Sequence, residues 1–346
     1  MSHREKVMRK SLIVCLVLLV SCGDNAQAQD SQQKAIAALK ELGATIKTSK
    51  AGMTSLSFPE LMTTDAGLIH VQGLMKLEQL NLNYTGITDT GLSYLQRQKH
   101  LARLGLCGTE ITDAGLAHLK GLMKLEELYL NYTEITDAGL KHLKEMTKLK
   151  ALGLLHARVT SDGLEHLEGL TALKELYLRD TRIDDAGLKR LKGLTNLTTL
   201  DLSNTKTSNS GFGHLKGLLK LQTLHLDGTQ ITDTGLVYLK RLANLETLSF
   251  PYTEVTDAGL EHLKGLANLT ELDLRRTRIS DAGLGHLKGH VKLETLHLDG
   301  TQITDMGLGH LKIFQNLKRL SLDRDKISKA AMADLQKSLP NCQIFY

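Results

Sequence analysis

Tryptophan is absent from the 346-residue sequence, proline occurs three times, and aromatic residues make up only 4% of the chain. A core of this composition must be built from aliphatic side chains. The 30 glycines and the constantly recurring leucines point to a repeated setting for that core. In a repeat protein the length counts repeats, so the usual estimate of domain number from length does not apply.

Cysteine is scarce as well. Of the four cysteines, Cys15 and Cys22 lie near the N-terminus, and only Cys107 and Cys342 belong to the remainder of the chain. These two lie far apart in a repeated sequence, whereas a disulfide needs Cα atoms within about 7 Å of each other. The sequence therefore excludes a disulfide framework, and stability must come from the stacking of repeats.

A strong charge of either sign is also missing. The chain has 43 basic and 38 acidic residues, and residues 1–21 hold four of the former and one of the latter. The remaining 39 basic and 37 acidic residues nearly balance. This balance leaves no electrostatic footprint for nucleic acid, so we expect no nucleic-acid partner.

Sequence motifs of catalysis are absent too. The chain has no glycine-rich phosphate loop, no G-x-S-x-G, no H-E-x-x-H and no closely spaced pair of cysteines. We therefore expect no enzymatic activity, no cofactor and no metal.

The N-terminus has the pattern of an export signal. Residues 1–10 are basic, and Ser11–Val20 is an apolar run of ten, too short for the roughly 20 residues of a membrane span but suited to a signal peptide. Leu19-Val20-Ser21-Cys22 resembles the lipobox of bacterial lipoproteins, which implies lipidation at Cys22. Ala26-Gln27-Ala28 offers an alternative cleavage site after residue 28. We expect a membrane-anchored lipoprotein of the cell envelope or, with the second site, a periplasmic or secreted protein.

The rest of the chain repeats every 24 residues as L-x-x-L-x-L-x-x-T-x-I-T-D-A-G-L-x-H-L-x-x-L. The L-x-L part alternates like a strand with one buried face, and the following leucines have helical spacing. One strand and one short helix per unit predict an α/β leucine-rich-repeat solenoid, with parallel strands on the concave side and helices on the convex side. Twelve strand positions run from Leu56 to Leu320, and Ile344 is in phase for a thirteenth.

Domain boundaries follow from this period. A helix over Ser31–Leu42, ended by Gly43, and a short strand over Thr45–Thr48 would cover the first repeat, as solenoids require. The predicted segments are a signal peptide (1–21), a linker (22–30), an N-terminal cap (31–53), leucine-rich repeats (54–326) and a C-terminal cap repeat (327–346).

Residues 54–346 resemble bacterial secreted leucine-rich-repeat proteins whose units carry T-D-A-G-L. The repeats are also similar to those of F-box/LRR adaptors, and Ala331–Ile344 is similar to the closing unit of the bacterial group. The resemblance implies recognition of a protein or another ligand, and it assigns no catalytic residues.

Two polar columns recur at fixed positions near the start of each helix. The aspartates are expected to cap the helices, with a calcium ladder as the alternative, and the threonines are expected to bond the backbone of the neighbouring coil. The columns are Asp89, Asp113, Asp137, Asp185, Asp233, Asp257, Asp281 and Asp305, and Thr85, Thr109, Thr133, Thr181, Thr205, Thr229, Thr253, Thr277 and Thr301.

Histidine and lysine form two further columns on the helices. One imidazole per coil does not converge on a zinc ion, so the histidines are expected to pack, and the lysines to form a solvated face or to contact an anionic polymer or lipid. The columns are His70, His118, His142, His166, His214, His262, His286 and His310, and Lys120, Lys144, Lys192, Lys216, Lys240, Lys264, Lys288 and Lys312.

Binding residues are expected among the variable, outward-facing strand positions. One candidate group is aromatic, since exposed tyrosine and arginine are typical of binding hot spots, and a secondary group is charged. The groups are Tyr129, Tyr132, Leu155, Tyr177 and Arg179, and His225, Asp227, Asp273, Arg275, His297 and Asp299.

The function predicted from these features is an extracytoplasmic binding scaffold. We expect a monomer that recognises a protein or glycan on its concave face and that is tethered to the membrane if Cys22 is acylated. Two alternatives remain open: an F-box-like substrate adaptor of a ubiquitin ligase, which the leader disfavours, and a structural envelope component without a discrete ligand.

Overall fold

The computed structural model describes residues 27, 29–49, 52, 54–59 and 63–346. The predicted signal peptide, the lipidation site Cys22 and the alternative cleavage site after Ala28 lie outside the described residues.

One sheet of 14 strands runs through the molecule, and its strand order is the order of the sequence. Strand β1 (Thr45–Thr48) pairs antiparallel with β2 (Thr54–Ser57), and every later strand pairs in parallel with the strand before it. The predicted solenoid, including its thirteenth repeat strand, is therefore confirmed. The later strands are β3 (Leu77–Asn81), β4 (Arg103–Gly105), β5 (Glu127–Tyr129), β6 (Ala151–Gly153), β7 (Glu175–Tyr177), β8 (Thr199–Asp201), β9 (Thr223–His225), β10 (Thr247–Ser249), β11 (Glu271–Asp273), β12 (Thr295–His297), β13 (Arg319–Ser321) and β14 (Gln343–Phe345).

A short helix follows most strands, usually one α-helical turn that tightens into a 3-10 turn. The α-helices are α2 (Asp65–Leu68), α3 (Asp89–Ser93), α4 (Asp113–Leu119), α5 (Asp137–Leu140), α6 (Asp185–Leu191), α7 (Asn209–Phe212), α8 (Asp233–Leu236), α9 (Asp257–Leu260), α10 (Asp281–Leu284), α11 (Leu308–Leu311) and α12 (Lys329–Ser338). The 3-10 helices are η1 (Ile69–Gly73), η2 (Lys141–Leu143), η3 (Gly163–Leu167), η4 (Leu215–Gly217), η5 (Leu239–Arg241), η6 (Glu261–Leu263), η7 (Gly285–Leu287) and η8 (Arg324–Lys326).

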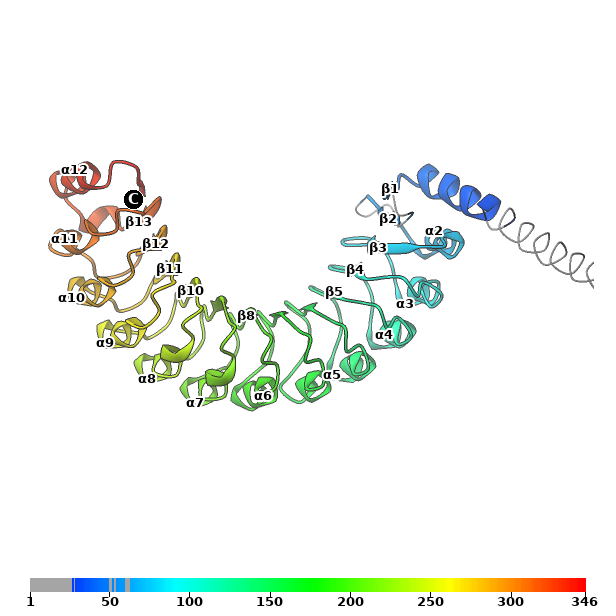
Figure 1. The fold of residues 1–346 in the computed structure, drawn as a ribbon, viewed down its shortest axis with the longest axis horizontal. Helices are drawn as coiled ribbons and strands as arrows, with labels where there is room; N and C mark the ends of the chain where they lie inside the picture. The colour runs from blue at the N-terminus through cyan, green and yellow to red at the C-terminus, as the bar shows by residue number, and fades with distance from the viewer. Residues whose placement is uncertain (1–26, 28, 50–51, 53, 60–62) are drawn as a thin grey trace, which may run out of the picture.

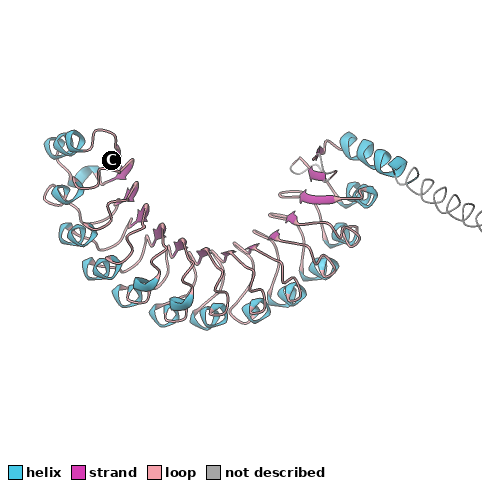
Figure 2. Cartoon of the chain, viewed as in Figure 1, coloured by secondary structure: helices cyan, strands magenta, loops and turns pink. Residues whose placement is uncertain are grey.

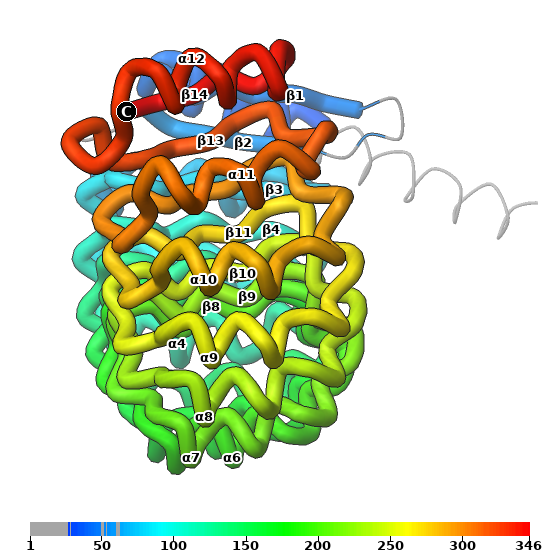
Figure 3. The backbone as a smooth tube through the Cα atoms, turned by 90° about the vertical axis from the view of Figure 1, so that its left-hand side faces the viewer, coloured from blue at the N-terminus to red at the C-terminus, as the bar shows by residue number. Residues whose placement is uncertain are grey.

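The coils stack into an open arc, with the strands on the inner side and the helices on the outer side (Figures 1 and 2). Neighbouring strands need only about 4.8 Å of spacing, whereas helices in contact need about 8–10 Å. The stack therefore bends toward the strands. Seen at right angles, the same coils form a band with turns along both of its flanks (Figure 3).

The core is a continuous ladder of aliphatic side chains inside this band. In the coil of β5, Leu128, Leu130, Ile135, Leu140 and Leu143 all have 0% exposure, and the other coils bury the same positions. Burying one such side chain contributes about 1.5–3 kcal/mol. Each coil is covered only by its neighbours, so the ends need caps.

The first described segment is a helix followed by the strand β1 (Thr45–Thr48). Residues 29–41 are helical, so the helix begins before Ser31, within the segment predicted as a linker. Its Leu39 is fully buried, and Gly43 has a left-handed φ of 79°, which suits the residue that ends a helix. At the other end, Leu335 of α12 is fully buried and covers the last repeat.

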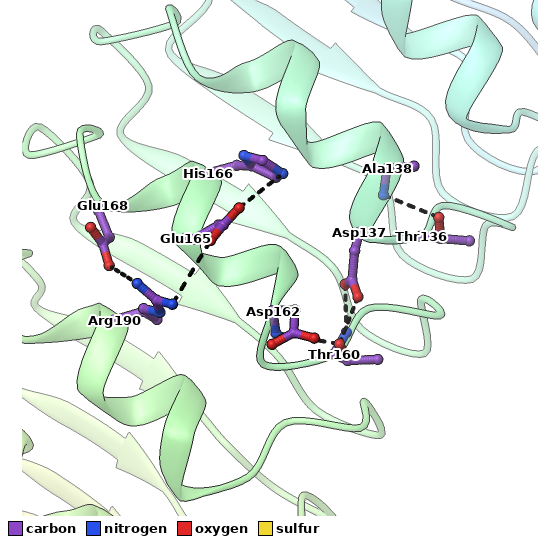
Figure 4. Close-up of polar contacts among 9 residues, drawn as sticks. All are labelled: Thr136, Asp137, Ala138, Thr160, Asp162, Glu165, His166, Glu168 and Arg190. Atoms are coloured by element: carbon purple, nitrogen blue, oxygen red, sulfur yellow. Dashed lines mark hydrogen bonds and ion pairs between the residues drawn. The ribbon is translucent and has the colours of Figure 1, made fainter.

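Aspartates of the recurring column join successive coils, and the prediction that they cap their own helices is wrong. The N-cap is the residue that precedes the aspartate. In α4 this residue is Thr112, whose side chain accepts a hydrogen bond from the N–H of Ala114. Asp113 is the first helical residue, and its carboxylate accepts from the N–H (2.8 Å) and the hydroxyl (2.6 Å) of Thr136 in the next coil. Figure 4 shows the same bridge between Asp137 and Thr160.

Glycine of the T-D-A-G-L motif is required by this bridge. A Cβ atom placed on Gly139 would collide with the Asp113 carboxylate oxygen of the preceding coil, and the same holds for Gly115 with Asp89. The glycine therefore makes room for the carboxylate that holds two coils together.

Threonines of the other column bond within their own coil, which corrects a second prediction. The Thr133 hydroxyl donates to the carbonyl oxygen of Leu130 at 2.6 Å, and Thr85 donates to Leu82 in the same way. The hydroxyl reaches back three residues because the chain turns sharply after the strand. These side chains stabilise the turn and do not link neighbouring coils.

Candidate functional site

The concave face carries the side chains that alternate with the buried leucines. Tyr129 lies between Leu128 and Leu130 and is half-buried on that face, whereas both leucines are fully buried. From residue 81 to residue 321 the same position holds Asn, Gly, Tyr, Asp, His or Ser, and no two neighbouring coils carry the same residue. A constant core thus presents a variable inner surface.

Tyr129 and Tyr177 lie on either side of Gly153. The strand pairing places Tyr129 opposite Gly153 and Gly153 opposite Tyr177. The phenol of Tyr129 donates to Glu127 at 3.4 Å, and that of Tyr177 donates to Glu175 at 3.0 Å. Because the partners are two residues back on the same strands, the rings lie along the sheet rather than standing out from it.

Both phenols are held in their protonated form. Burial, followed by the negative charge of Glu127 and Glu175, raises the pKa of Tyr129 to about 12. Burial and Glu175 raise the pKa of Tyr177 as well. At neutral pH each hydroxyl therefore remains a hydrogen-bond donor, and the two rings offer apolar faces beside a glycine.

Leu155 and Arg179 occupy the next outward column, beside the tyrosine pair. Both are half-buried. The N–H of Leu155 donates to the Asn131 side chain at 3.0 Å, and Arg179 Nε lies 3.3 Å from a carboxylate oxygen of Asp180. The arrangement is an aromatic patch with one leucine and one guanidinium at its edge, and tyrosine and arginine are residues typical of binding hot spots.

Tyr132 lies elsewhere, on the turn after β5. Its backbone is left-handed (φ 57°), its side chain is 51% exposed, and its ring lies 5.4 Å from the ring of His156. Together with Arg158 and Asp180 these residues line a hollow of about 320 Å³ on the flank of the band. The prediction grouped Tyr132 with the concave tyrosines because it is close to Tyr129 in the sequence, whereas its side chain lines this flank hollow.

His156 was not among the binding residues predicted from the sequence, although its place in the 24-residue unit sets it apart. Positions in phase with it hold Gly108, Gly228 and Gly300, all with positive φ. Glycine is the residue that adopts this backbone without strain. The bulky residues at the same phase are therefore the unusual ones: Tyr84, Tyr132, His156, Tyr252 and Arg276.

A second feature that the sequence did not reveal is a concave hollow of about 330 Å³ on the N-terminal side of Tyr129. Its floor includes Gly105, and its walls are amide, hydroxyl and charged groups. They include Ser55, Gln79, Asn81, Asn83, Arg103 and Glu127.

The charged candidate group is largely paired internally. Arg275 contacts the Asp273 carboxylate with both Nε (3.0 Å) and a terminal nitrogen (2.6 Å), and Asp273 is only 6% exposed. Asp227 accepts from Ser249 at 2.5 Å. His225 and His297 lie on β9 and β12, three strands apart.

Asp299 and His297 share Ser321 as a partner. The Ser321 hydroxyl donates to Asp299 and lies 3.0 Å from His297 Nδ1. Three strands away, after β9, burial and the nearby Asp273 and Asp201 carboxylates raise the pKa of Asp227 even though Ser249 and His225 favour its charged form. This half of the concave face is therefore acidic, and its carboxylates are fixed by neighbouring groups.

The histidine column on the convex side makes polar contacts of its own. Figure 4 shows His166 beside Glu165, with 3.9 Å between Nε2 and the carboxylate, and Arg190 reaching Glu168 at 3.0 Å. Within the part of the chain that the structure describes, no group of three or more histidine, cysteine, aspartate or glutamate side chains could hold a metal ion. Over the same residues, no helix is long and apolar enough to cross a membrane.

Comparison with known proteins agrees with this architecture. Two leucine-rich-repeat family models match the chain, one over residues 171–231 and the other over residues 73–95, 121–144 and 265–287. A search of curated protein sequences found no match. The chain thus carries leucine-rich repeats.

Solved structures share the fold at low sequence identity. An internalin of Listeria monocytogenes is 24% identical, with a TM-score of 0.65 over 85% of this chain and 86% of its own. A leucine-rich-repeat protein of Leptospira interrogans is 21% identical, with a TM-score of 0.59 over 84% and 75%. A chain of the mouse RP105/MD-1 complex is 18% identical, with a TM-score of 0.58 over 81% and 51%. The protein is therefore a leucine-rich-repeat solenoid.

Proposed function

We propose that this chain is an extracytoplasmic recognition scaffold that binds a protein partner with its concave face. The observation that carries the proposal is the surface around Tyr129, Gly153 and Tyr177, where two half-buried rings flank a glycine on a rigid sheet. Rigid aromatic side chains that lose little entropy on binding are the usual anchors of protein interfaces.

The C-terminal half of the concave face would select among partners. Its carboxylates Asp227 and Asp299 favour a basic surface, and charge complementarity contributes mainly to specificity and association rate. The solved mouse relative, which has the same fold, was crystallised as a complex of RP105 with MD-1. A chain with this fold therefore takes part in a complex with another protein, which supports the proposal that the present chain binds a protein. The export pattern of residues 1–28 supports an extracytoplasmic location.

Site-specific photocrosslinking in the native cell tests the proposal. A photoreactive phenylalanine analogue replaces Tyr177 in one variant and Lys192, on the convex side, in a second. We expect a discrete crosslinked protein from position 177 that is absent from position 192. Equal crosslinking at both positions, or none at 177, would contradict a concave binding site.

The partner so identified then allows an affinity test. Tyr129→Ala with Tyr177→Ala should weaken binding at least about 30-fold, because a hot-spot tyrosine contributes on the order of 2 kcal/mol and such losses need not add. His225→Ala with His297→Ala is the matched control on the other half of the face. A larger loss in the histidine variant would move the anchor to the acidic half.

A further inference from the structure

Apolar side chains are exposed at the tips of the turns that lead into the strands, a flank we call the entry flank. Met75, Met123, Leu219 and Val291 are 49%, 46%, 46% and 55% exposed, and they occupy the same position of the 24-residue unit. Turn tips ordinarily hold glycine, asparagine, aspartate or serine. The apolar residues are therefore not explained by the turn itself.

Backbone hydrogen bonds fix these residues at the tips. The N–H of Leu125 donates to Leu122 at 3.0 Å, and the N–H of Leu221 donates to Leu218 at 3.1 Å. Met123 and Leu219 are thus the first of the two central residues in closed turns. The second central residue is a lysine after all four apolar tips: Lys76, Lys124, Lys220 and Lys292.

The entry flank is basic as a whole. Its turn tips, from 75–76 to 315–316, contain six lysines and no aspartate or glutamate. A hollow of about 250 Å³ there is lined by Lys76, Lys124, Lys148 and His100, together with Glu78 of β3 and Glu126, the residue before β5. The lysine column of the helix ends, such as Lys120 and Lys144, precedes these tips by three residues and adds to the charge.

The opposite flank has a different character. The helices begin there with the bridging aspartates, and its exposed aromatic residues are Tyr84, Tyr132 and Tyr252. The helices cross the width of the band (Figure 3). The bridging aspartates therefore lie along one flank, together with arginines such as Arg158 and Arg182, and the lysine columns lie along the other. A nearly neutral chain thereby presents one basic flank that carries apolar tips.

We infer that the entry flank docks on an anionic lipid bilayer. Lysines beside a negatively charged leaflet are attracted to its headgroups, and side chains of the size of Met and Leu gain free energy by entering the acyl boundary. The tips lie along one flank of an arc, so a flat surface can meet several of them at once. A soluble anionic polymer would pair with the lysines but would offer no apolar medium to the tips.

This orientation is independent of the concave site. The bilayer would lie against the flat side of the arc, and the inner surface with Tyr129 and Tyr177 would stay open to solvent. Loss of bilayer binding and loss of partner binding can therefore be measured separately.

A fluorescence experiment reports which flank meets the bilayer. The full chain with Cys15→Ala and Cys22→Ala keeps only the buried Cys107 and Cys342, and an environment-sensitive nitrobenzoxadiazole label is attached through Met123→Cys or, as the control on the other flank, Tyr132→Cys. With phosphatidylglycerol vesicles we expect a blue shift and quenching by lipid-borne quencher at position 123 but not at 132. An equal response at both positions would overturn the inference.

A second experiment separates the apolar and charged contributions. In the same background, Met75, Met123, Leu219 and Val291 are replaced by threonine, which the chain itself uses at the equivalent tips 147, 171 and 195, so the fold is expected to persist. Partition onto phosphatidylglycerol vesicles should fall more than tenfold. Lys124→Gln or Lys220→Gln should each lower it about fivefold.

The control variant Tyr84→Ser with Tyr132→Ser and Tyr252→Ser should leave the partition coefficient unchanged. Equal binding to phosphatidylcholine vesicles, or unchanged partition of the threonine variant, would contradict docking through this flank. Binding to soluble polyphosphate without any label response to vesicles would assign the flank to an anionic polymer and overturn the lipid assignment.

Discussion

Because Gly139 has no side chain, the Asp113 carboxylate of the preceding coil has room to bond Thr136. The position lies in a helical turn, where alanine is ordinarily favoured over glycine by roughly 0.5–1 kcal/mol. Here a Cβ atom would displace the Asp113 carboxylate from its two hydrogen bonds to Thr136. The local preference of the helix is outweighed by the bridge between coils.

Gly139→Ala is therefore expected to destabilise the protein by about 1–3 kcal/mol, the range for overpacking a filled site. Gly193→Ala is the control, because no atom lies within 4 Å of a Cβ built there, and it should shift stability by no more than about 0.5 kcal/mol. Urea denaturation midpoints measure both. Equal midpoints would show that the carboxylate can move aside freely.

Ser161 and Asp184 exchange the two chemical groups of the bridge. Ser161 stands where most other coils have aspartate, and Asp184 stands where they have threonine or serine. The Ser161 hydroxyl donates to the Asp184 carboxylate at 2.5 Å. Asp184 also caps α6 by accepting from the N–H of Ala186. The coils remain joined because one carboxylate and one hydroxyl are still present.

Ser161→Asp should therefore destabilise the protein by about 1–2 kcal/mol, because it places two carboxylates in contact. Asp184→Thr alone leaves two hydroxyls and should cost less than about 1 kcal/mol. The double variant restores the usual pair, and a double-mutant cycle on urea midpoints should give a coupling energy of at least about 1 kcal/mol. Additive effects would show that the two groups do not interact.

Among the coils, the one around Asp185 offers a test of the bridge through pH. Burial alone would raise the pKa of Asp185, but hydrogen bonds from the Ser208 and Ser210 side chains and from the backbone hold it below the usual value. A carboxyl group with a lowered pKa in the folded state contributes stability that is complete above its unfolded pKa of about 4 and is lost as pH falls through the folded value.

Asp185→Asn keeps the bridge geometry, as the natural Asn209 does when its side chain accepts from the Thr232 N–H at 2.8 Å and donates to the Thr232 hydroxyl at 2.8 Å. We expect the wild type to be more stable than this variant at pH 6 and the difference to shrink below about pH 4. Denaturant titrations across this range measure it. A constant difference would show that the carboxylate charge does not matter.

A weak coil is expected around Thr207. This threonine is fully buried at a position that holds isoleucine or valine in all the other coils from Ile87 to Ile327. Its hydroxyl bonds the nearby Thr205 hydroxyl at 3.0 Å, and the buried hydroxyl of Ser203 in the same coil has no hydrogen-bond partner. The substitution of Asn209 for aspartate is not part of the weakness, because the bridge to Thr232 is retained.

Amides of this coil should exchange with solvent faster than those of the flanking coils. Thr207→Val, which has the same shape, should slow their exchange and raise stability by about 1 kcal/mol, since Thr205 still donates to Leu202 at 2.6 Å. Hydrogen exchange followed by mass spectrometry resolves the peptides. Slower exchange in the wild-type coil than in its neighbours would refute the prediction.

The strands and helices could be predicted from the sequence because the buried leucines recur with the 24-residue period. The partners of the polar columns could not, because the period does not say toward which coil a side chain points. Asp113 lies at a helix start, where aspartate usually caps, and only the stacked coils show that it reaches Thr136. In the candidate site, Tyr129 and Tyr177 follow from strand alternation, whereas the place of Tyr132 depends on a left-handed turn.

The molecule as a whole should scatter as an elongated arc. Fourteen strands in one sheet span roughly 60 Å at about 4.8 Å per step, whereas a globule of this length would have a radius of gyration of about 20 Å. Small-angle X-ray scattering of the purified protein should give a clearly larger value. A radius near that of a globule would contradict the open arc.

The exchanged groups at Ser161 and Asp184 also limit how the gene can have grown. The string Leu-His-Leu-Asp-Gly-Thr-Gln-Ile-Thr-Asp at 224–233 and again at 296–305 indicates that blocks of coils were copied. If a copied block ended between Ser161 and Asp184, the Ser161 hydroxyl would face a threonine of the next coil, so that two hydroxyls met. At the other end of the block, Asp184 would face an aspartate of the preceding coil, so that two carboxylates met. Copying these two coils together keeps their carboxylate and hydroxyl paired, whereas a boundary between two coils with the usual pair preserves the bridge wherever it falls.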